Sequence, residues 1–287
     1  MYDSCVKAFT LLFSLVCATA AMAGEPALRT IAERKVLRVG MLAGVAPFVA
    51  TGADAESMRT VLGQNAPPLV RAVDGRSVCG FDVELASAAA QALSATLEVT
   101  LVASYDQLLS GLREGRYDLV ASALTRTLER ATTIAFTDPY FASGLLVLVR
   151  DPARFPLLDA LRKPGVKIAF LAGTTAAAFA QRELAAAALV PLATDAALVA
   201  ASDDAAQADA LVIDYVTARD AQVRGRVKSS LTSLEDRRFT TEQFALATRQ
   251  GDPDWVAWLN LFLKHEKVSG GFHRLAARYN AWFRSER

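Results

Sequence analysis

The feature that most constrains the fold of this sequence is a repeated alternation of short apolar strands with amphipathic helical segments. Leu97, Val99 and Leu101 alternate with polar residues as the side chains of a half-buried strand do. A helical apolar stripe over residues 105–112 follows, and residues 118–124 predict another strand that ends in small polar residues. Because helices separate the strands, we expect an α/β protein built on parallel sheets.

The same pattern extends along the rest of the chain. Four more apolar strands are predicted, at residues 36–40, 145–149, 167–171 and 210–213. Two C-terminal helices carry aromatic stripes, which we interpret as core packing. Residues 50–77, in contrast, are rich in Gly, Pro, Ala and charge without clear periodicity. They predict a long loop or a small insertion.

The N-terminus has the order of a secretory signal peptide. Lys7 precedes an apolar run over residues 8–20, and small residues lead up to Ala23. We therefore expect residues 1–23 to be a signal peptide cleaved after Ala23, and the mature protein to be periplasmic. A permanent membrane anchor is the weaker alternative, because the apolar run is short. Lipid attachment at Cys17 is also disfavoured, since Val16 precedes it where a small residue is needed.

Charge and cysteine content exclude several classes of protein. The chain has 31 Lys and Arg against 30 Asp and Glu, so net charge gives it no attraction to nucleic acid or an anionic membrane. Cleavage after Ala23 would leave Cys79 as the only thiol, and no intramolecular disulfide could form. Flanked by Val78 and Phe81, Cys79 is expected to be buried and inert.

Signatures of catalysis and of metal binding are absent from the sequence. His265 and His273 are its only histidines, and neither has further ligands at metal-binding spacing. The phosphate-binding patterns GxGxxG and GxxxxGK[ST] and the nucleophile elbow GxSxG do not occur. We therefore expect no metal, no cofactor and no catalytic residue; the missing motifs argue against an enzyme without excluding one.

A series of motifs runs collinearly from residue 37 to residue 283. They are LRVG at 37–40, GFDVEL at 80–85, YDLV at 117–120, TRTLERATTIAFTDPYF at 125–141, KPGVKIAFLAGTT at 163–175, ADALVID at 208–214 and RYNAWF at 278–283. In this order they resemble the bacterial extracellular solute-binding proteins of family 3, which serve amino-acid ABC importers. The block at 125–141 is the most specific of them.

The resemblance implies a type II periplasmic binding protein fold, with two α/β lobes joined by a two-strand hinge. Lobe 1 would be discontinuous, built from residues 37–143 plus 240–287, and lobe 2 would comprise residues 144–239. The crossings are expected at 143–148 and 234–244. Such lobes place strand ends and helix N-termini at the cleft between them, where open α/β sheets bind ligands. A monomer that delivers its ligand to an ABC permease is the implied partner arrangement.

The resemblance also implies two charged anchors for an amino acid. Arg130 matches the arginine of the family's T-x-x-R motif, and its planar fork can hold a carboxylate with two parallel bonds. Asp214 matches the aspartate that binds the ligand ammonium. Without the resemblance, Arg130 would be taken for an exposed helix charge and Asp214 for a helix cap, since Asp is a preferred capping residue.

Smaller contributions to the site follow from the same matching. Thr175 lies where a strand, a glycine and a helix start meet, so its N–H and hydroxyl could add to carboxylate binding from lobe 2. Thr125 and Ala123 match positions that contact the ligand carboxylate and ammonium, Ala123 through its backbone alone. Ordinary strand-end structure is the alternative for both.

The predicted side-chain pocket departs from that of relatives that bind basic amino acids. Leu42 stands where they have an acidic residue, and Val45 stands where they have an aromatic one. Tyr105 matches a pocket wall and can lie against apolar or planar groups. We therefore expect a small, neutral amino acid or a similar carboxylate as the ligand.

Two rival functions stay open from the sequence. The same fold includes cyclohexadienyl dehydratases, enzymes that act on prephenate or arogenate and need a carboxylic acid as proton donor. The other rival is a sensory or adaptor protein, whose liganded lobes dock on a receptor or a dehydrogenase. The segment at 50–77 keeps this second alternative open.

Overall fold

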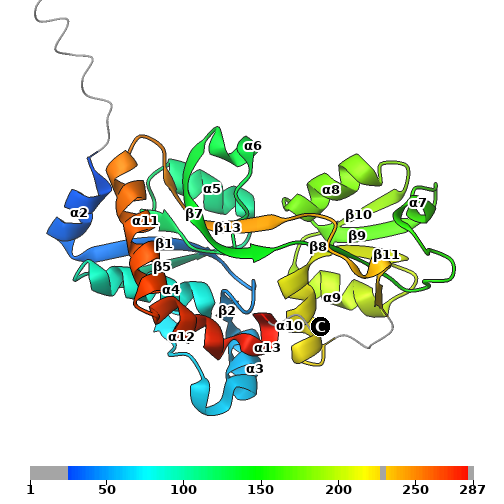
Figure 1. Ribbon diagram of the computed structural model, residues 1–287, viewed down its shortest axis with the longest axis horizontal. Helices are drawn as coiled ribbons and strands as arrows, with labels where there is room; N and C mark the ends of the chain where they lie inside the picture. Colours follow the sequence, from blue (N-terminus) through cyan, green and yellow to red (C-terminus); the bar gives the residue numbers. More distant parts are fainter. Residues whose placement is uncertain (1–24, 227–230, 284–287) are drawn as a thin grey trace, which may run out of the picture.

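The computed structural model of this protein describes residues 25–226 and 231–283, which form two α/β lobes side by side (Figure 1). The signal peptide predicted at 1–23 lies outside the described residues. Each lobe is built on a five-stranded sheet of its own, and a third, smaller sheet belongs to the first lobe. The α/β class expected from the sequence is confirmed, and two lobes with a sheet each are the arrangement expected of the type II periplasmic binding fold. None of the helices within the described ranges is long and apolar enough to cross a membrane.

The first sheet has the strand order β5-β1-β6-β13-β7. Strand β1 lies between β5 and β6 and runs parallel to both, as the alternation of strands and helices predicts. The late strand β13 inserts between β6 and β7 and is antiparallel to both, because it returns from the second lobe. The bounds are Val36–Leu42 for β1, Thr96–Val102 for β5, Leu119–Val120 for β6, Ile134–Ser143 for β7 and Glu242–Arg249 for β13.

Helices from both ends of the chain cover the first sheet. Pro253–Val268 forms α11, whose Trp255 is buried and donates from Nε1 to the Asp118 carbonyl at 3.0 Å. Tyr279 and Trp282 are also fully buried. The interpretation of the C-terminal aromatic stripes as core packing is thereby confirmed. The other helices are α2 (Ala27–Arg34), α4 (Phe81–Ala92), α5 (Tyr105–Arg113), α6 (Leu128–Ala131), α12 (Gly271–Arg278) and α13 (Asn280–Phe283).

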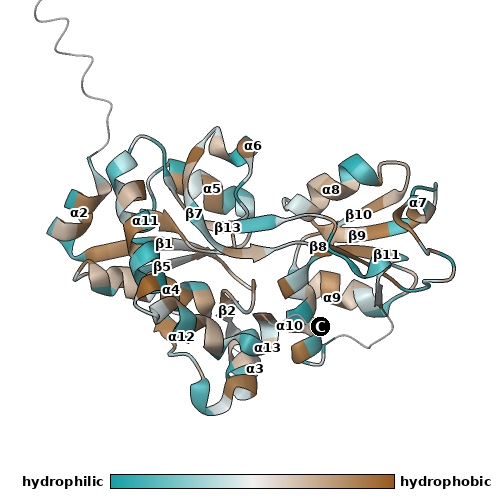
Figure 2. Cartoon of the chain, in the orientation of Figure 1, coloured by the Kyte–Doolittle hydropathy of each residue, from teal (hydrophilic) through white to brown (hydrophobic). Residues whose placement is uncertain are grey.

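The second sheet has the order β10-β9-β11-β8-β12. Alternate residues of its strands enter two separate apolar clusters, Ile168 and Val212 on one face and Ala169 and Leu211 on the other. Burial on both faces explains the continuous apolar runs in the sequence, and Figure 2 shows the apolar character of β1 and β9. The elements are β8 (Leu145–Val149), α7 (Leu158–Leu161), β9 (Lys167–Leu171), α8 (Thr175–Glu183), β10 (Ala188–Leu192), α9 (Asp195–Asp203), β11 (Ala210–Asp214), α10 (Tyr215–Val223) and β12 (Thr232–Ser233).

Two extended segments cross between the lobes and are hydrogen-bonded to each other. Leu145 donates its N–H to Thr240 Oγ1 at 3.0 Å and accepts from the Phe239 N–H at 2.8 Å. At Gly144 the two segments approach closely, because a Cβ there would lie 2.4 Å from the Thr240 carbonyl oxygen. All strands of the first sheet fall within residues 37–143 or 240–287, except for the first residue of β1, and all strands of the second within 144–239.

Residues 50–77 form a small folded unit and not a long loop. Its three strands pair antiparallel in the order β2-β4-β3. Ala55 and Met58 on its helix are buried, and Cys79 at the end of its last strand is buried too. The small-insertion alternative of the sequence analysis is therefore the correct one. The bounds are Ala50–Thr51 for β2, Gly52–Leu62 for α3, Gly63–Asn65 for η2, Val70–Arg71 for β3 and Ser77–Cys79 for β4.

Candidate ligand-binding site

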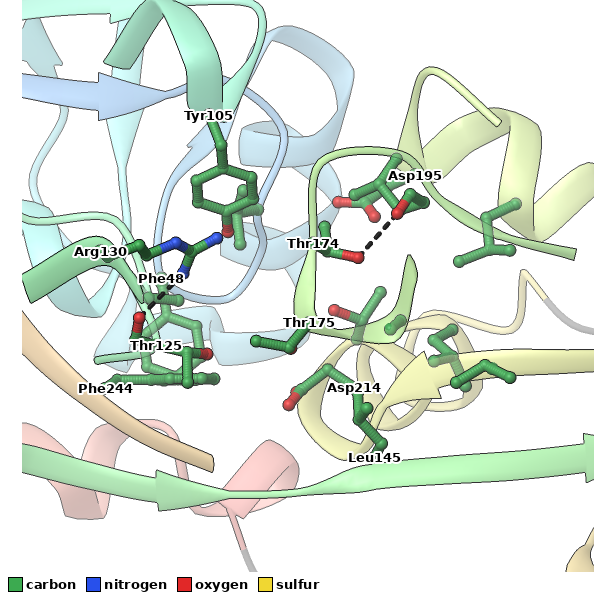
Figure 3. A pocket seen from close by; sticks show the side chains of 18 residues that line it. Phe48, Tyr105, Thr125, Arg130, Leu145, Thr174, Thr175, Asp195, Asp214 and Phe244 are labelled. Atoms are coloured by element: carbon green, nitrogen blue, oxygen red, sulfur yellow. Dashed lines mark hydrogen bonds between the residues drawn. The ribbon is translucent and has the colours of Figure 1, made fainter. Parts of the chain in front are cut away.

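A cavity lies between the two lobes and takes its lining from both (Figure 3). It encloses about 640 Å³ of empty space when its open mouth is included. The first lobe contributes Val45, Phe48, Tyr105, Ala123, Thr125, Arg130 and Phe244, and the second contributes Leu145, Leu171, Thr174, Thr175, Ala176, Asp195, Leu198, Val212, Ile213, Asp214 and Thr217.

Arg130 is held in the cavity by its own short helix and by a neighbouring carbonyl. Thr127 caps α6 by accepting the Arg130 N–H at 3.1 Å, and Arg130 Nη1 donates to the Thr125 carbonyl at 2.8 Å. Its Nη2 reaches across to the Gly173 carbonyl of the second lobe at 3.4 Å. Among the described residues, no carboxylate forms an ion pair with Arg130. Burial lowers its pKa, so an anionic ligand group would relieve a desolvated cation.

Asp214 caps a helix and also lines the cavity. Its Oδ1 caps helix α10 by accepting the Val216 N–H at 2.7 Å. Its Oδ2 is buried without a hydrogen-bond partner in the described structure, and the residue lines the cavity. Burial raises the pKa of Asp214 to about 6. A carboxylate in this position is left with one unsatisfied oxygen that a ligand ammonium could complete.

Ala123 is held in a conformation that leaves only its carbonyl free for a ligand. Its φ of +45° lies in the left-handed region, which is unfavourable for a residue with a Cβ. The Ala123 N–H is occupied, because it donates to Asp82 Oδ2 at 2.6 Å. The same oxygen of Asp82 accepts from the Tyr140 hydroxyl at 2.9 Å. Fully buried, Asp82 has its pKa raised to about 7.

The remaining predicted residues divide into those at the cavity and one that lies away from it. Tyr105, Val45, Thr125 and Thr175 line it, Thr175 as the first residue of helix α8. Leu42 does not line it. Its side chain is packed in the core of the first lobe, because β1 still runs beneath the helices there.

Asp195 is a charged residue of the cavity that our sequence analysis missed. It is the first residue of α9, directly after the capping Thr194, and it lines the cavity on the side of the second lobe (Figure 3). Burial raises its pKa to about 7, with Asp220 adding to the effect and Arg226 opposing it. The only sequence signal is a Thr-Asp pair before an apolar run, which is also the ordinary signature of a helix start.

Comparison of the sequence with models of known protein families identifies the family of this chain. Residues 58–284 match the model of the bacterial extracellular solute-binding proteins, family 3. The chain belongs to this family. The resemblance noted in the sequence is therefore confirmed.

Individual relatives and a solved structure of this solute-binding protein family agree with the assignment. The chain is 27% identical over 258 residues to a putative ABC transporter arginine-binding protein 2 of Escherichia coli, covering 87% of this chain and 99% of the relative. It is 30% identical over 173 residues to a cyclohexadienyl dehydratase of Pseudomonas aeruginosa, covering 60% and 56%. An ancestral amino acid-binding protein, a precursor of cyclohexadienyl dehydratase, has a TM-score of 0.73 and 29% identity, covering 90% and 99%.

Proposed function

We propose that this family 3 protein captures a free α-amino acid in the periplasm and delivers it to an ABC permease. The observation that carries the proposal is that Arg130 and Asp214 come from opposite lobes and line one cavity. A free amino acid presents a carboxylate and an ammonium, and each needs an opposite charge when water is excluded. A ligand held from both sides would stabilise the closed arrangement of the lobes, as in hinge-closing binding proteins.

Two observations point to different kinds of ligand side chain. Val45, Phe48 and Phe244 give the first-lobe wall an apolar character, in keeping with the predicted small neutral amino acid. Asp195 adds a carboxyl group from the second lobe, for which the described structure contains no hydrogen-bond or ion-pair partner. It favours a ligand side chain that ends in a cation or a hydrogen-bond donor. The neutral ligand therefore stays a prediction, and its original basis at Leu42 is weaker because Leu42 lies outside the cavity lining.

Calorimetry on the mature chain tests both parts of the proposal. The twenty amino acids are titrated alongside matched compounds that lack one charge, namely the decarboxylated amine and the deaminated acid of the best ligand. We expect binding of the complete amino acid and loss of affinity for both truncated forms. Preference for arginine or lysine over every neutral amino acid would reject the prediction of a neutral ligand but not the proposal that the protein binds an amino acid. Equal affinity for the amine and the amino acid would reject Arg130 as the carboxylate anchor.

A dehydratase activity is the second candidate, favoured by the acids in the cavity. Asp195 has a pKa raised to about 7, the value at which a carboxyl group can donate a proton near neutral pH. The similarity to the Pseudomonas aeruginosa dehydratase adds to this candidate. Incubation with prephenate and ultraviolet detection of phenylpyruvate tests it, with Asp195→Asn as the control variant. Turnover by the wild-type protein that disappears in this variant would establish the enzyme.

A further inference from the structure

A compact cluster of four charged residues joins the small insertion to the second lobe. Arg224 Nη1 lies 2.7 Å from Asp54 Oδ1, and Arg226 Nη1 lies 3.1 Å from the same oxygen. The Nη2 atoms of both arginines pair with Asp220 Oδ2. We call Asp54, Asp220, Arg224 and Arg226 the interlobe clasp. Its two positive charges are balanced by two negative ones.

The members of the clasp come from segments far apart in the sequence. Asp54 lies in the first turn of α3, within the insertion of the first lobe. Asp220 belongs to α10 of the second lobe, and Arg224 and Arg226 follow directly after that helix. In Figure 1, α3 and α13 both lie beside α10, at the place where the two lobes meet.

The C-terminal helix α13 adds polar and apolar contacts to the same junction. Trp282 Nε1 donates to Asp220 Oδ1 at 2.9 Å, and Arg219 Nε donates to the Ala281 carbonyl at 3.2 Å. Val216 of α10 belongs to the core cluster that contains Trp282. One helix of the second lobe is therefore packed partly into the core of the first.

Because two of the four side chains of the interlobe clasp are buried, the loss of any one partner would be costly. The side chains of Arg224 and Asp220 are each 1% exposed, whereas Asp54 is 34% exposed and Arg226 is 28% exposed. Removing one partner of a buried ion pair leaves an uncompensated charge out of water, which is costly. A rotation that opened the cleft and carried α3 away from α10 would break the bond of Arg224 to Asp54 and leave Arg224 paired with Asp220 alone.

We propose that Asp54, by pairing with Arg224 and Arg226, holds the lobes in the closed arrangement even without ligand, and that this is the role of the 50–77 insertion. Ligand affinity depends on the fraction of the free protein that is already in the binding-competent state. The clasp therefore raises affinity without touching the ligand. This effect on affinity rests on the proposed function, whereas the effect on the shape of the free protein does not.

Small-angle X-ray scattering of the ligand-free mature protein tests the clasp directly. Asp54→Asn removes the charge but keeps the shape of the side chain, and we expect a larger radius of gyration than in the wild type. The matched control is Asp74→Asn in the same insertion, where the Asp74–Arg76 pair is exposed, and no change is expected. Since the clasp is ionic, 1 M NaCl should shift the wild-type scattering in the same direction. Superimposable curves for Asp54→Asn and wild type would overturn the proposal.

Ligand titration gives an independent measurement on the same variants. We expect Asp54→Asn to weaken binding of the best amino acid about 10-fold, a typical coupling between two sites, and Asp74→Asn to leave it unchanged. If Asp54→Asn does not fold, Arg226→Gln replaces it, because Arg226 is partly exposed and Arg224 keeps its pair with Asp220. Failure of every amino acid to bind would reject the proposed function. The scattering experiment would still test whether the interlobe clasp holds the lobes of the free protein together. Expansion of the free protein without any loss of affinity would reject the link to binding.

Discussion

The guanidinium carbon of Arg130 lies 5.4 Å from the centroid of the Tyr105 ring. This distance is within the range of a cation–π interaction, and burial raises the pKa of Tyr105 above its usual value, so the phenol stays neutral. Together with the bond to the Thr125 carbonyl, the ring fixes the plane of the guanidinium before any ligand arrives. A planar fork held in this way is preorganised for the two oxygens of a carboxylate.

The first prediction concerns Arg130 itself. We expect Arg130→Ala to weaken amino-acid binding by about 3 kcal/mol, roughly 100-fold, since it removes one partner of a desolvated charge pair. Arg130→Lys should restore only part of this loss, because a lysine cannot form the paired bonds. Titration calorimetry measures both, with Arg29→Ala as a control in an exposed pair with Glu33. Near-native affinity of Arg130→Ala would remove Arg130 from the site.

The second prediction is a pH dependence of binding through Asp214. Its pKa of about 6 in the free protein means that the carboxyl is protonated in mildly acidic solution and cannot pair with an ammonium. Affinity should therefore rise between pH 5 and pH 7, and Asp214→Asn should bind weakly with a flatter profile over that range. Calorimetry at fixed ionic strength measures the profile. Identical profiles for variant and wild type would assign the titration to another group.

The third prediction is that Asp195 makes the stability of the ligand-free protein depend on pH. Its pKa in the folded state, about 7, is raised above the usual aspartate value of 3.8. The folded protein therefore binds this proton more tightly than the unfolded chain does. The resulting stability is fully present below about pH 4 and is lost as pH rises through 7.

The variant Asp195→Asn isolates this contribution from that of Asp82, whose pKa is raised in the same direction. Urea unfolding between pH 5 and pH 8 should show a smaller fall in stability for the variant than for the wild type. A saturating ligand with a cationic side chain should cancel the difference if the cation pairs with Asp195. Parallel stability profiles would mean that the Asp195 carboxylate is solvated.

The fourth prediction is a packing defect at Gly80, which precedes helix α4. Its φ is +141°, and a Cβ there would lie 2.2 Å from the Phe48 carbonyl oxygen. Gly80→Ala should therefore lower the free energy of unfolding by about 3 kcal/mol or more. Gly165→Ala is the matched control, because Gly165 has a φ of +83° with nothing within 4 Å. Gly165→Ala should lower the free energy of unfolding by only about 1 kcal/mol. Equal losses for the two variants would show that the close contact at Gly80 does not affect stability.

Local patterns in the sequence predicted the strands β1, β5, β6, β8, β9 and β11, because these carry an apolar alternation or a continuous apolar run. They did not predict β7, β10 or β13. The residues 50–77 lacked such a period, since β2, β3 and β4 have at most three residues each. Strands this short leave no readable alternation. Their pairing depends on contacts with α3 and on the register between distant residues, which the local sequence does not record.

The candidate site was predictable to the extent that motifs carried it. Arg130 and Asp214 were found through collinear motifs, and the structure brings both to one cavity. Asp195 was missed because an acid at a helix start is common, and only the packing of the lobes makes it a cavity residue. Leu42 was placed in the pocket by matching alone. The side chain of a residue at the end of a strand can point into the core or into the cleft. Which of the two it does depends on neighbouring side chains that the local sequence does not specify.

The position of β13 between β6 and β7 has a consequence for how the chain assembles. The first sheet spans residues from Val36 to Arg249, and β7 is joined to its neighbours only through β13. The second sheet, in contrast, is complete once Ser233 has been made. Pairings between distant segments form slowly, because a long loop must close first. A chain emerging from the ribosome or the export channel can therefore finish the second sheet while the first still lacks β13, its last strand in chain order.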